Sequence, residues 1–473
     1  MDAVSKKTKI VATIGPVSDS KKTIEQLISA GVNVFRFNMK HNTVDWHEER
    51  AARVQSVADK LNVPVGILID LQGPEIRIRT HKSKSIEAKR GDIFKLVKTE
   101  PGSYDEIKVT PVSSIDVLKA GDKILIDDGF VELNCTKIHA GMVYAAVQSS
   151  CKIENQKGMN LPGKELKLPS LIKADLDRLD IATRSKVDFV ALSYTRTKKD
   201  ISILRNEATK KKISCNIIAK IESQQGLDNI DEIISEADGI MIARGDLGLE
   251  VPIEEIVFWQ KQIINKCRFA NKPVIVATQM LQSMVSNVIP TRAEVTDVAN
   301  AVLDGADALM LSAETASGSY PVKAAQTMSK IAIFNENNRV VDLKFQHHML
   351  TQDDLVVNAG MELLRENTIF PVDAIIALSE TGYTARSISS FRPGVPIYIV
   401  TSNQKTVETL TLSYATSAFK SSVDYKEKNL AKEAVNFLRS KRVIKKGQRI
   451  LIIFGTSWSK PGKTNSLAIM KVN

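Results

Sequence analysis

Two charged residues of opposite sign lie at the end of one short apolar run. Lys220 and Glu222 are two positions apart in the segment NIIAKIE, residues 216–222. Side chains two positions apart in a strand point to the same side, so this ammonium and this carboxylate would face one surface. Glu222 and Asp246, which follows the next apolar run, would supply two hard oxygen ligands for Mg2+. An ammonium beside such an ion suits a phosphoryl group in transfer, and a structural Lys–Glu pair is the alternative.

Polar residues follow several other apolar runs as well. They are Arg36 and Asn38, Asp70, Ser193, Arg244 with Gly245 and Asp246, Thr278, and Ser312 with Glu314. Any one of them alone is typical of a salt bridge or a cap, Thr278 in particular. Burying charges from so many strands at one face is costly unless a ligand or metal ion compensates. Gly245 would let backbone N–H groups approach an anion, and Arg36 and Arg77 are candidate forks for a phosphate.

The spacing of the apolar runs predicts the elements that would position these residues. Short runs followed by stretches with helical spacing indicate βα units and a parallel sheet. The runs are residues 9–15, 33–38, 65–71, 187–193, 216–221, 239–244, 273–278 and 308–312, and residues 23–31 and 254–270 are two of the helical stretches. Eight parallel strands close a (β/α)8 TIM barrel, whose chemistry lies at the carboxyl ends of its strands.

Two regions depart from this rhythm. Residues 73–169 alternate polar and apolar side chains, with turn signals at Asp128-Gly129, Ala140-Gly141 and Pro162-Gly163. Residues 346–473 contain further strand-like runs at 374–379, 397–402 and 450–455 and a helical stretch at 427–440. The predicted fold class is therefore α/β: a TIM barrel from 1–72 and 170–345, an inserted antiparallel β-barrel lid domain at 73–169, and a C-terminal α/β regulatory domain at 346–473.

Composition narrows the class of protein. The 473 residues suffice for roughly three domains of about 150 residues. The formal charge of +11 favours anionic ligands, but no aromatic residues interleave with the basic run 439–449, so no nucleic-acid partner is expected. Four widely spaced cysteines and the absence of a long apolar run predict a cytoplasmic protein without a membrane partner.

Ordered motifs along nearly the whole chain resemble the pyruvate kinase family. The segment 216–227, NIIAKIESQQGL, is similar to that family's signature around its catalytic lysine and metal-binding glutamate. The others are KTKIVATIGP (7–16), DLQGPEIR (70–77), KGMNLPG (157–163), IMIARGDLGLEVP (240–252), KPVIVATQML (272–281), PTRAEVTDVANAVLDGADALMLSAETASG (290–318) and PGKTNS (461–466). The resemblance implies phosphoryl transfer from phosphoenolpyruvate to ADP in glycolysis, giving pyruvate and ATP.

The resemblance also implies roles for individual residues. Arg36 would hold the transferring phosphate, Lys220 would stabilise its charge, and Glu222 and Asp246 would bind Mg2+, with Mn2+ as an alternative. Other implied positions are Gly245 and Asp246 at the substrate carboxylate, Ser193 in the substrate site, Thr278 beside the enolate carbon, and Asn38, His41, Arg77 and Lys157 at the nucleotide. Closure of the lid would exclude water. Two further implications are a homotetramer and a phosphorylated effector at Ser379, Thr381, Gly382 and Thr384, with Arg386 and Lys463 nearby.

One motif departs from the family pattern. Most of the family binds K+ through Asn, Ser, Asp and Thr, and the corresponding positions here are Asn38, Lys40, Asp70 and Leu71. A lysine within reach of Asp70 and Glu75 would repel K+ and take its place as a tethered cation. We therefore expect an enzyme that does not require K+. The alternative is that Lys40 points to solvent and the cation site is only weakened.

Two other functions compete with this interpretation. A barrel lyase or aldolase acting on pyruvate-like enolates would share the carboxylates for Mg2+, but it would not need Arg77 or Lys157. The second is a binding or regulatory protein that resembles the family but has lost turnover because of Lys40 and Leu71. The presence of Lys220, Glu222, Asp246 and Thr278 together argues against that second alternative.

Overall fold

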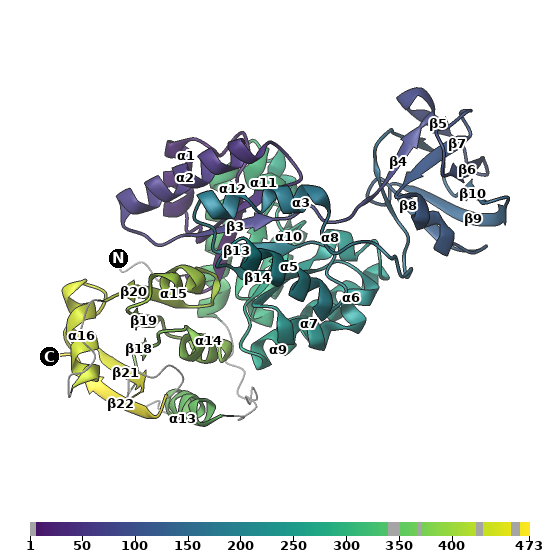
Figure 1. The fold of residues 1–473 in the computed structure, drawn as a ribbon. Coiled ribbons are helices and arrows are strands. Elements are labelled where there is room, and N and C mark those ends of the chain that lie inside the picture. The colour runs from purple at the N-terminus through teal and green to yellow at the C-terminus, as the bar shows by residue number, and fades with distance from the viewer. Residues whose placement is uncertain (1–5, 339–350, 367–370, 422–428, 456–463) are drawn as a thin grey trace.

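The computed structural model describes residues 6–338, 351–366, 371–421, 429–455 and 464–473. It contains a barrel surrounded by helices, a smaller all-β unit, and a C-terminal α/β unit on the far side of the barrel from the β unit (Figure 1). This arrangement confirms the predicted fold class. Within the described residues, no helix is both long and apolar enough to cross a membrane.

Eight parallel strands close the central barrel in the spatial order β1, β2, β3, β13, β14, β15, β16, β17. Their bounds are β1 Lys9–Thr13, β2 Val34–Asn38, β3 Gly66–Asp70, β13 Phe189–Leu192, β14 Asn216–Ile221, β15 Gly239–Ala243, β16 Val274–Ala277 and β17 Ala308–Leu311. Each lies within the run predicted for it. The register places Asn38 opposite Asp70, and Lys220 opposite Met241 of the next strand, so the polar strand ends meet at one rim.

Helices surround this barrel. They are α1 Lys21–Ser29, α2 Val44–Leu61, α3 Lys173–Arg178, α4 Ile181–Arg184, α5 Lys198–Lys210, α6 Gln224–Asp228, α7 Ile230–Glu236, α8 Arg244–Leu247, α9 Ile256–Phe269, α10 Arg292–Asp304, α11 Ala313–Ala316 and α12 Pro321–Asn337, with 3-10 turns at Ile253–Glu255 and Gln282–Val285. The sequence marks several ends. Thr291 and Glu294 form a capping box at the start of α10, and Gly305 ends that helix with φ of 91°, where glycine is favoured.

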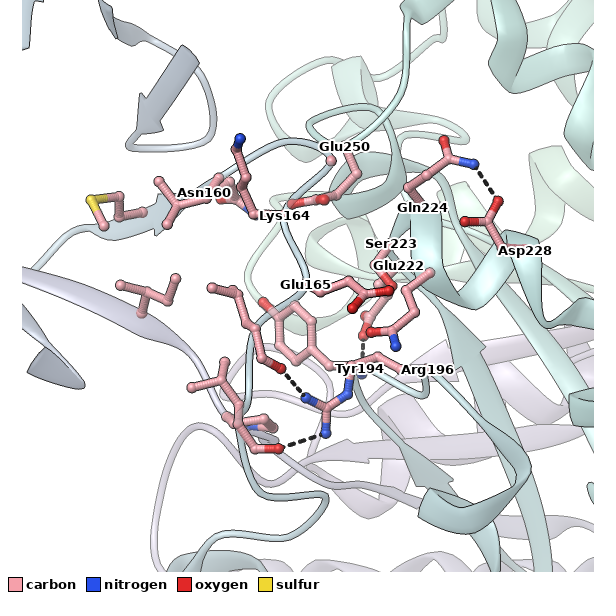
Figure 2. A pocket seen from close by; sticks show the side chains of 18 residues that line it. Asn160, Lys164, Glu165, Tyr194, Arg196, Glu222, Ser223, Gln224, Asp228 and Glu250 are labelled. Carbon is pink, nitrogen blue, oxygen red and sulfur yellow. Dashed lines mark hydrogen bonds between the residues drawn. The ribbon is translucent and has the colours of Figure 1, made fainter. Parts of the chain in front are cut away.

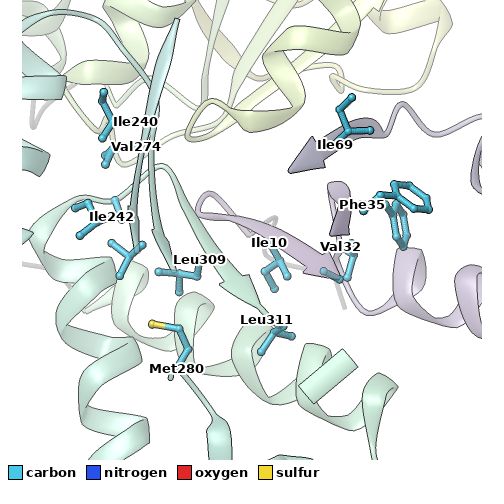
Figure 3. Close-up of a cluster of buried hydrophobic side chains, with 14 of the residues drawn as sticks. Ile10, Val32, Phe35, Ile69, Ile240, Ile242, Val274, Met280, Leu309 and Leu311 are labelled. Atoms are coloured by element: carbon cyan, nitrogen blue, oxygen red, sulfur yellow. The ribbon is translucent and has the colours of Figure 1, made fainter. Parts of the chain in front are cut away.

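Apolar side chains fill two layers of the barrel. The larger layer lies between strands and helices and includes Ile10, Phe35, Ile242 and Leu309 (Figure 3). The smaller layer fills the barrel interior, and Leu412 of the C-terminal unit joins it from the amino-terminal end. Burial at about 25 cal/mol per Å2 of apolar surface makes these layers the main source of stability, which leaves the carboxyl-terminal rim available for polar groups.

The inserted unit is a second closed barrel. Its order is β10, β6, β7, β4, β12, β8, β9, with a separate pair of β11 and β5. The strands are β4 Ile76–Thr80, β5 Ile86–Ala88, β6 Ile93–Val97, β7 Glu106–Thr110, β8 Lys123–Ile126, β9 Val131–His139, β10 Met142–Val147, β11 Cys151–Ile153 and β12 Gly158–Asn160, with 3-10 turns at His81–Ser83 and Val112–Val117. Ala140 and Gly141 both have positive φ, as the predicted β9–β10 turn requires.

One pairing in this unit differs from the predicted antiparallel pattern. β6 and β7 pair in parallel, with Lys95 opposite Glu106 and Leu96 opposite Ile107. The reason is that residues 98–105 carry the chain back to the same end of the barrel before β7 begins. The other pairs in the barrel are antiparallel, as expected.

The C-terminal unit is a five-stranded sheet covered by helices on both faces. The order is β20, β19, β18, β21, β22, and β22 alone is antiparallel. The bounds are α13 Gln352–Glu366, β18 Ala374–Leu378, α14 Tyr383–Ser390, β19 Ile397–Thr401, α15 Gln404–Thr409, a 3-10 turn Leu410–Leu412, β20 Thr416–Lys420, α16 Leu430–Ser440, β21 Arg449–Phe454 and β22 Ser466–Lys471. The sequence predicted β18, β19, β21 and α16 but not β20 or β22.

Candidate active site

The ammonium of Lys220 lies at the centre of the polar rim. Its Nζ is 2.8 Å from Oε1 of Glu222 and 3.2 Å from Oδ1 of Asp70, and it donates to Oγ of Ser193 at 2.7 Å. Ser193 in turn donates to the carbonyl oxygen of Leu71 at 2.7 Å. Strands β3, β13 and β14 therefore deliver one cation and its acceptors to a single point, as the strand-end pattern predicted.

A second cation lies on the opposite side of Asp70. Arg36, on β2, donates through Nε to Oδ2 of Asp70 at 2.7 Å and through Nη1 to Oγ1 of Thr13 at 2.9 Å. Asp70 is 1% exposed, so its charge depends on these partners. Burial would raise the pKa of Asp70, but Lys220 and Arg36 together hold it below its ordinary value. The result is a rigid pair of cations suited to a phosphate.

Acidic groups outnumber cations around Lys220, because Asp70, Glu222 and Asp246 all lie near it. Burial opposes the charge on Lys220, but Asp70, Glu222 and Asp246 outweigh it and raise its pKa. Burial raises the pKa of Glu222, and the nearby charge of Asp246 adds to the rise even though Lys220 opposes it. Burial also raises the pKa of Asp246. A further cation near Glu222 and Asp246 would stabilise both carboxylates.

Glu222 and Asp246 fit a divalent metal ion. Oε2 of Glu222 accepts the backbone N–H of Tyr194 at 2.6 Å, which fixes the carboxylate. Within the described ranges, the Asp246 carboxylate forms no hydrogen bond or ion pair, and no group of three or more His, Cys, Asp or Glu side chains is arranged for a metal ion. The chain would thus supply two hard oxygen ligands, and water and substrate oxygens would supply the others.

The segment after β15 is held against the end of β16. Oγ1 of Thr278 accepts the backbone N–H of Gly245 at 2.7 Å and donates to the carbonyl oxygen of Ala277 at 2.6 Å. Thr278 has φ of 69°, which is strained for a β-branched residue, and such strain concentrates at functional sites. Arg244 binds both carboxylate oxygens of Asp297 at 2.6 Å and donates to the Thr278 carbonyl oxygen. These contacts fix the short helix α8, which carries Asp246.

The positions predicted for the monovalent cation are only partly together. Nζ of Lys40 is 2.6 Å from Oε1 of Glu75, whose Oε2 is 2.6 Å from Arg77. Oδ1 of Asn38 accepts the backbone N–H of Lys40. Within the described residues, no ion pair or hydrogen bond joins Lys40 to Asp70, whose carboxylate is bound by Arg36 and Lys220. The Lys40 side chain is 37% exposed, so it lies at the edge of the site.

The candidate nucleotide residues lie on two separate units. His41 is at the exposed rim, where partial burial and the charges of Lys40 and Arg36 lower its pKa. Arg77 lies at the base of the lid and donates to the carbonyl oxygen of Gln156. Lys157, also in the lid, is 3.0 Å from Asp127 and 3.2 Å from Glu154, and no ion pair joins it to the barrel within the described residues. Its predicted place near Asn38 and His41 would require lid closure.

A cavity of about 180 Å3 lies between the base of the lid and the barrel (Figure 2). Glu222 and Tyr194 form its inner wall, Glu250 and Gln224 lie on the barrel side, and Lys164 belongs to the segment that returns from the lid. Lys164 is already paired with Asp122, and burial raises the pKa of Glu250 to about 7. The cavity thus leaves open space at the base of the lid beside Glu222, one of the two candidate metal ligands.

The turn predicted to bind an effector is largely engaged in internal contacts. Ser379 and Thr384 are buried, and Thr384 shares a hydrogen bond with Thr464. Glu380 accepts hydrogen bonds from the backbone and hydroxyl of Ser402. Thr381 is exposed, and Gly382 has φ of 76°. Lys463 lies outside the described residues.

Two residues of the site were not singled out from the sequence. Thr13, at the end of β1, accepts a hydrogen bond from Arg36. Its position at a strand end could have marked it as a site residue, as the same position did for Thr278. Asp297, on α10, holds Arg244 from 53 residues away. No local pattern distinguishes Asp297 from any other acidic residue on a helix, so only the folded chain identifies it.

Comparisons with known proteins agree along the whole chain. Residues 5–325 match the family model described as pyruvate kinase, barrel domain, and residues 356–470 match pyruvate kinase, alpha/beta domain. A pyruvate kinase from Bacillus licheniformis is 38% identical over 99% of this chain and 80% of the relative. One from Staphylococcus aureus strain MRSA252 is 38% identical over 98% of this chain and 80% of the relative. The crystal structure of a pyruvate kinase from Cryptosporidium parvum matches with a TM-score of 0.92 and 31% identity, covering 99% of this chain and 96% of that one.

Proposed function

The chain belongs to the pyruvate kinase family and is a phosphotransferase, and we propose that it transfers the phosphoryl group of phosphoenolpyruvate to ADP in glycolysis, giving pyruvate and ATP. The observation that carries the proposal is the position of the Lys220 ammonium, within 3.2 Å of Asp70 and Glu222 at the carboxyl rim of the barrel. Phosphoryl transfer depends on positioning and on charge stabilisation, and this rim supplies both.

The phosphate of the substrate would lie between Arg36 and Lys220. As the bond from phosphorus to the enol oxygen breaks and a new bond forms to the terminal phosphate oxygen of ADP, negative charge develops on the oxygens around phosphorus. The guanidinium of Arg36 holds the group, and the Lys220 ammonium stabilises that charge. Ser193 accepts a hydrogen bond from Lys220 and thereby fixes its direction.

The rest of phosphoenolpyruvate would lie along the Gly245–Asp246 segment. The backbone N–H of Gly245 now meets the Thr278 hydroxyl, and the substrate carboxylate would take over that hydrogen bond. The freed hydroxyl of Thr278 then lies near the enolate carbon and helps to deliver a proton to it, through water. Arg244 holds Thr278 and Gly245 at a fixed distance from each other during the reaction, because it donates to the Thr278 carbonyl oxygen and is the residue next to Gly245.

Glu222 and Asp246 would hold Mg2+, for which Mn2+ can substitute. When bound, this ion neutralises phosphate and enolate oxygens as charge shifts between them. Asn38, His41, Arg77 and Lys157 would form the nucleotide side once the lid closes, and closure would exclude water that would otherwise receive the phosphoryl group. Pyruvate should therefore form from phosphoenolpyruvate only when ADP and Mg2+ are both present, measured in a coupled assay.

The same assay separates the competing functions. A lyase or aldolase would release pyruvate without ADP, and a protein that has lost turnover would release none under any condition. Either result, obtained with folded protein at saturating substrate, contradicts the proposed reaction. A rate that falls at least 100-fold when either ADP or Mg2+ is left out supports it, since the chemical step then depends on both.

We further propose that Lys40 replaces the monovalent cation. Its ammonium neutralises Glu75, which lies beside Arg77 on the nucleotide side, and a bound K+ ion would be repelled by it. The Leu71 side chain offers no oxygen, although its backbone oxygen is present and accepts from Ser193. The enzyme should turn over at the same rate in buffers with and without K+.

The Lys40→Ser variant tests this position. Without K+ we expect its kcat/KM for ADP to fall about tenfold, the effect of losing ~1.4 kcal/mol of charge stabilisation. K+ need not restore activity unless the Leu71 position also suits the ion. The control is Lys60→Ser, which removes an exposed lysine 3.6 Å from Glu25 on the outer helices and should leave the rate unchanged. Strong activation of the unaltered enzyme by K+ would exclude the tethered-cation proposal.

The remaining features follow from family membership as proposals. We expect a cytoplasmic homotetramer, with functional units at 1–72 and 170–345, 73–169, and 346–473. A phosphorylated effector at the 379–384 turn is supported by the exposed Thr381 and the glycine at 382. Glu380 weakens that site, because its carboxylate faces Ser402 and would repel a phosphate.

A further inference from the structure

Two chain segments connect the lid to the barrel (Figure 1). The outgoing segment, residues 71–75, follows β3, and the returning segment, residues 161–172, runs from β12 to α3. Both segments lie wholly within the described residues, and neither contains a helix or a strand. Their backbone N–H and carbonyl groups therefore depend on partners outside a helix or a sheet.

The carboxylate of Asp175, on α3, binds both segments. Its Oδ1 accepts the backbone N–H of Gln72 at 2.9 Å and that of Gly73 at 3.3 Å, both in the outgoing segment. Its Oδ2 accepts the backbone N–H of Ile172, the last residue of the returning segment, at 3.1 Å. Asp175 is fully buried, so these three donors take the place of water. One side chain thus joins the beginning of the lid to its end.

The surroundings of Asp175 make these contacts hard to replace. Burial raises the pKa of Asp175, although the three N–H donors and the charge of Arg178 oppose the rise. Arg178, further along α3, also donates to Oε1 of Gln72 at 2.8 Å. Removing one partner from a buried polar group costs more than the hydrogen bond itself contributes. The outgoing segment is therefore held firmly against α3.

Helix capping accounts for only one of the contacts of Asp175. This residue is the third of α3, where an acidic side chain often accepts the N–H of the residue that caps the helix, here Ile172. The contacts with Gln72 and Gly73 reach 103 and 102 residues back along the chain. They add nothing to the cap of α3, but they determine where the outgoing segment lies.

The backbone at Gly73 is enclosed on its other side by the active-site rim. Gly73 has φ of 71°, and a Cβ atom there would lie 2.9 Å from Cβ of Ser193 and 3.0 Å from Cδ2 of Tyr194. Ser193 accepts a hydrogen bond from Lys220 and donates to the carbonyl oxygen of Leu71. The outgoing segment therefore lies between Asp175 and the residues that hold the catalytic lysine.

The returning segment has a second attachment to the barrel at Arg196, which follows β13. Nη1 of Arg196 donates to the carbonyl oxygen of Leu166 at 2.9 Å, and Nη2 donates to that of Leu168 at 2.8 Å (Figure 2). Together with the contact between Asp175 and Ile172, these hydrogen bonds attach residues 166–172 to the barrel. Movement of the lid must therefore begin on the lid side of both attachments.

We propose that Asp175 is a positioning residue of the enzyme, which sets where the lid lies relative to the rim by binding both connecting segments. The inference rests on the proposed reaction, because the lid carries Lys157 and, at its base, Arg77 of the nucleotide side. Asp175 contacts none of the groups assigned to phosphoenolpyruvate, which lie on the barrel. Its loss should therefore impair the use of ADP more than the use of phosphoenolpyruvate.

The Asp175→Asn variant tests this role. The side-chain amide directs an N–H donor toward one of the backbone N–H groups, so one of the two segments loses its acceptor. We expect KM for ADP to rise about tenfold or more, the usual effect of losing one hydrogen bond to a charged group. KM for phosphoenolpyruvate and kcat at saturating ADP should change less than about threefold. Steady-state kinetics of the full chain measure all three values.

Amide hydrogen exchange measures the attachment of the segments without turnover. In Asp175→Asn, the backbone N–H groups of Gln72 and Gly73, or that of Ile172, should exchange about tenfold faster or more. The backbone N–H of Leu71 donates to the carbonyl oxygen of Ala191, so its exchange should not change. This measurement tests Asp175 even in a chain that lacks the proposed reaction, whose failure appears separately as no ADP-dependent pyruvate formation by the unaltered enzyme.

The matched control is Glu294→Gln. Glu294 also joins two stretches of chain, because it accepts the backbone N–H groups of Ser283 at 2.6 Å and Thr291 at 2.8 Å, but neither stretch leads to the lid. We expect Glu294→Gln to lower the melting temperature while KM for ADP stays within about twofold.

A milder variant keeps the proposal testable if Asp175→Asn does not fold. Arg178→Gln removes only the contact with the side chain of Gln72 and should raise KM for ADP about threefold. Thermal denaturation verifies that each variant is folded.

Four results would overturn the proposal. The first is a tenfold fall in kcat of Asp175→Asn with KM for ADP unchanged, which would place the effect on the chemical step. The second is an equal rise in KM for ADP in Glu294→Gln. The third is unchanged amide exchange in both segments of Asp175→Asn. Where Asp175→Asn does not fold, the fourth is an unchanged KM for ADP in Arg178→Gln.

Discussion

Replacing Lys220 by methionine should lower kcat by about 1,000-fold or more, because one preorganised cation at a developing charge contributes on the order of 100- to 100,000-fold. The ammonium touches Glu222, Asp70 and Ser193 within 3.2 Å, so its position is fixed before substrate binds. Methionine keeps most of the volume but removes the charge. Steady-state kinetics at saturating phosphoenolpyruvate, ADP and Mg2+ measure the loss, and a kcat within tenfold of the unaltered enzyme would contradict the assigned role.

The variant should remain folded, because the groups that Lys220 leaves behind have other partners. Asp70 keeps Arg36 at 2.7 Å, and Glu222 keeps the backbone N–H of Tyr194. The matched control is Lys9→Met at the opposite end of the barrel. Lys9 is also buried and donates to the carbonyl oxygen of Thr416, and burial lowers its pKa to about 8. We expect Lys9→Met to lower the melting temperature while kcat stays within about twofold, which separates loss of a buried lysine from loss of the catalytic one.

The strand ends were predictable because alternation and position both act locally. Lys220 lies between two apolar residues of its strand, and neighbouring side chains in a strand point to opposite faces. Its side chain therefore points away from theirs. Because Lys220 is near the carboxyl end of its strand, it lies at the same rim of the barrel as Asp70 and Ser193. The βα rhythm alone therefore predicted which groups would meet. It did not predict β20, because the sequence TSAFK of Thr416–Lys420 shows little alternation of polar and apolar residue types. It also did not predict β22, which is recognised as a strand only by its pairing with β21.

Contacts between distant segments set the limit of the sequence-based prediction. Lys40 was expected within reach of both Asp70 and Glu75, and the fold leaves it only Glu75 because Arg36 and Lys220 approach Asp70 from inside the barrel. Lys157 was expected at the nucleotide, and its contacts are with Asp127 and Glu154 of its own unit. In both cases the residue type correctly indicated a lysine that pairs with a carboxylate. Which carboxylate it pairs with depended on which one lay nearest after folding.

Replacing Asp307 by asparagine should destabilise the protein by about 3–5 kcal/mol, because it leaves a buried arginine without its counter-charge. Asp307 precedes β17 at the base of the barrel and lies 2.5 Å from Arg392 of the C-terminal unit. It also accepts the backbone N–H groups of Tyr414 at 2.9 Å and Val274 at 3.2 Å. For a chain of 473 residues we expect the melting temperature to fall by roughly 3–5 °C. Since the pair lies at the far end from Lys220, kcat at 25 °C should change less than about twofold.

Two variants distinguish an unpaired buried charge from a general loss of an aspartate. Asp231→Asn breaks an ion pair with Lys266 in which the aspartate side chain is 77% exposed, and it should cost less than about 1 kcal/mol. Adding Arg392→Met to Asp307→Asn removes the charge that was left unpaired, so part of the lost stability should return. Two outcomes would show that the interface is held by apolar contacts such as Leu412 and not by this pair. One is an equal loss of unfolding free energy in Asp307→Asn and Asp231→Asn. The other is a loss in the double variant that exceeds the sum of the losses in the Asp307→Asn and Arg392→Met single variants.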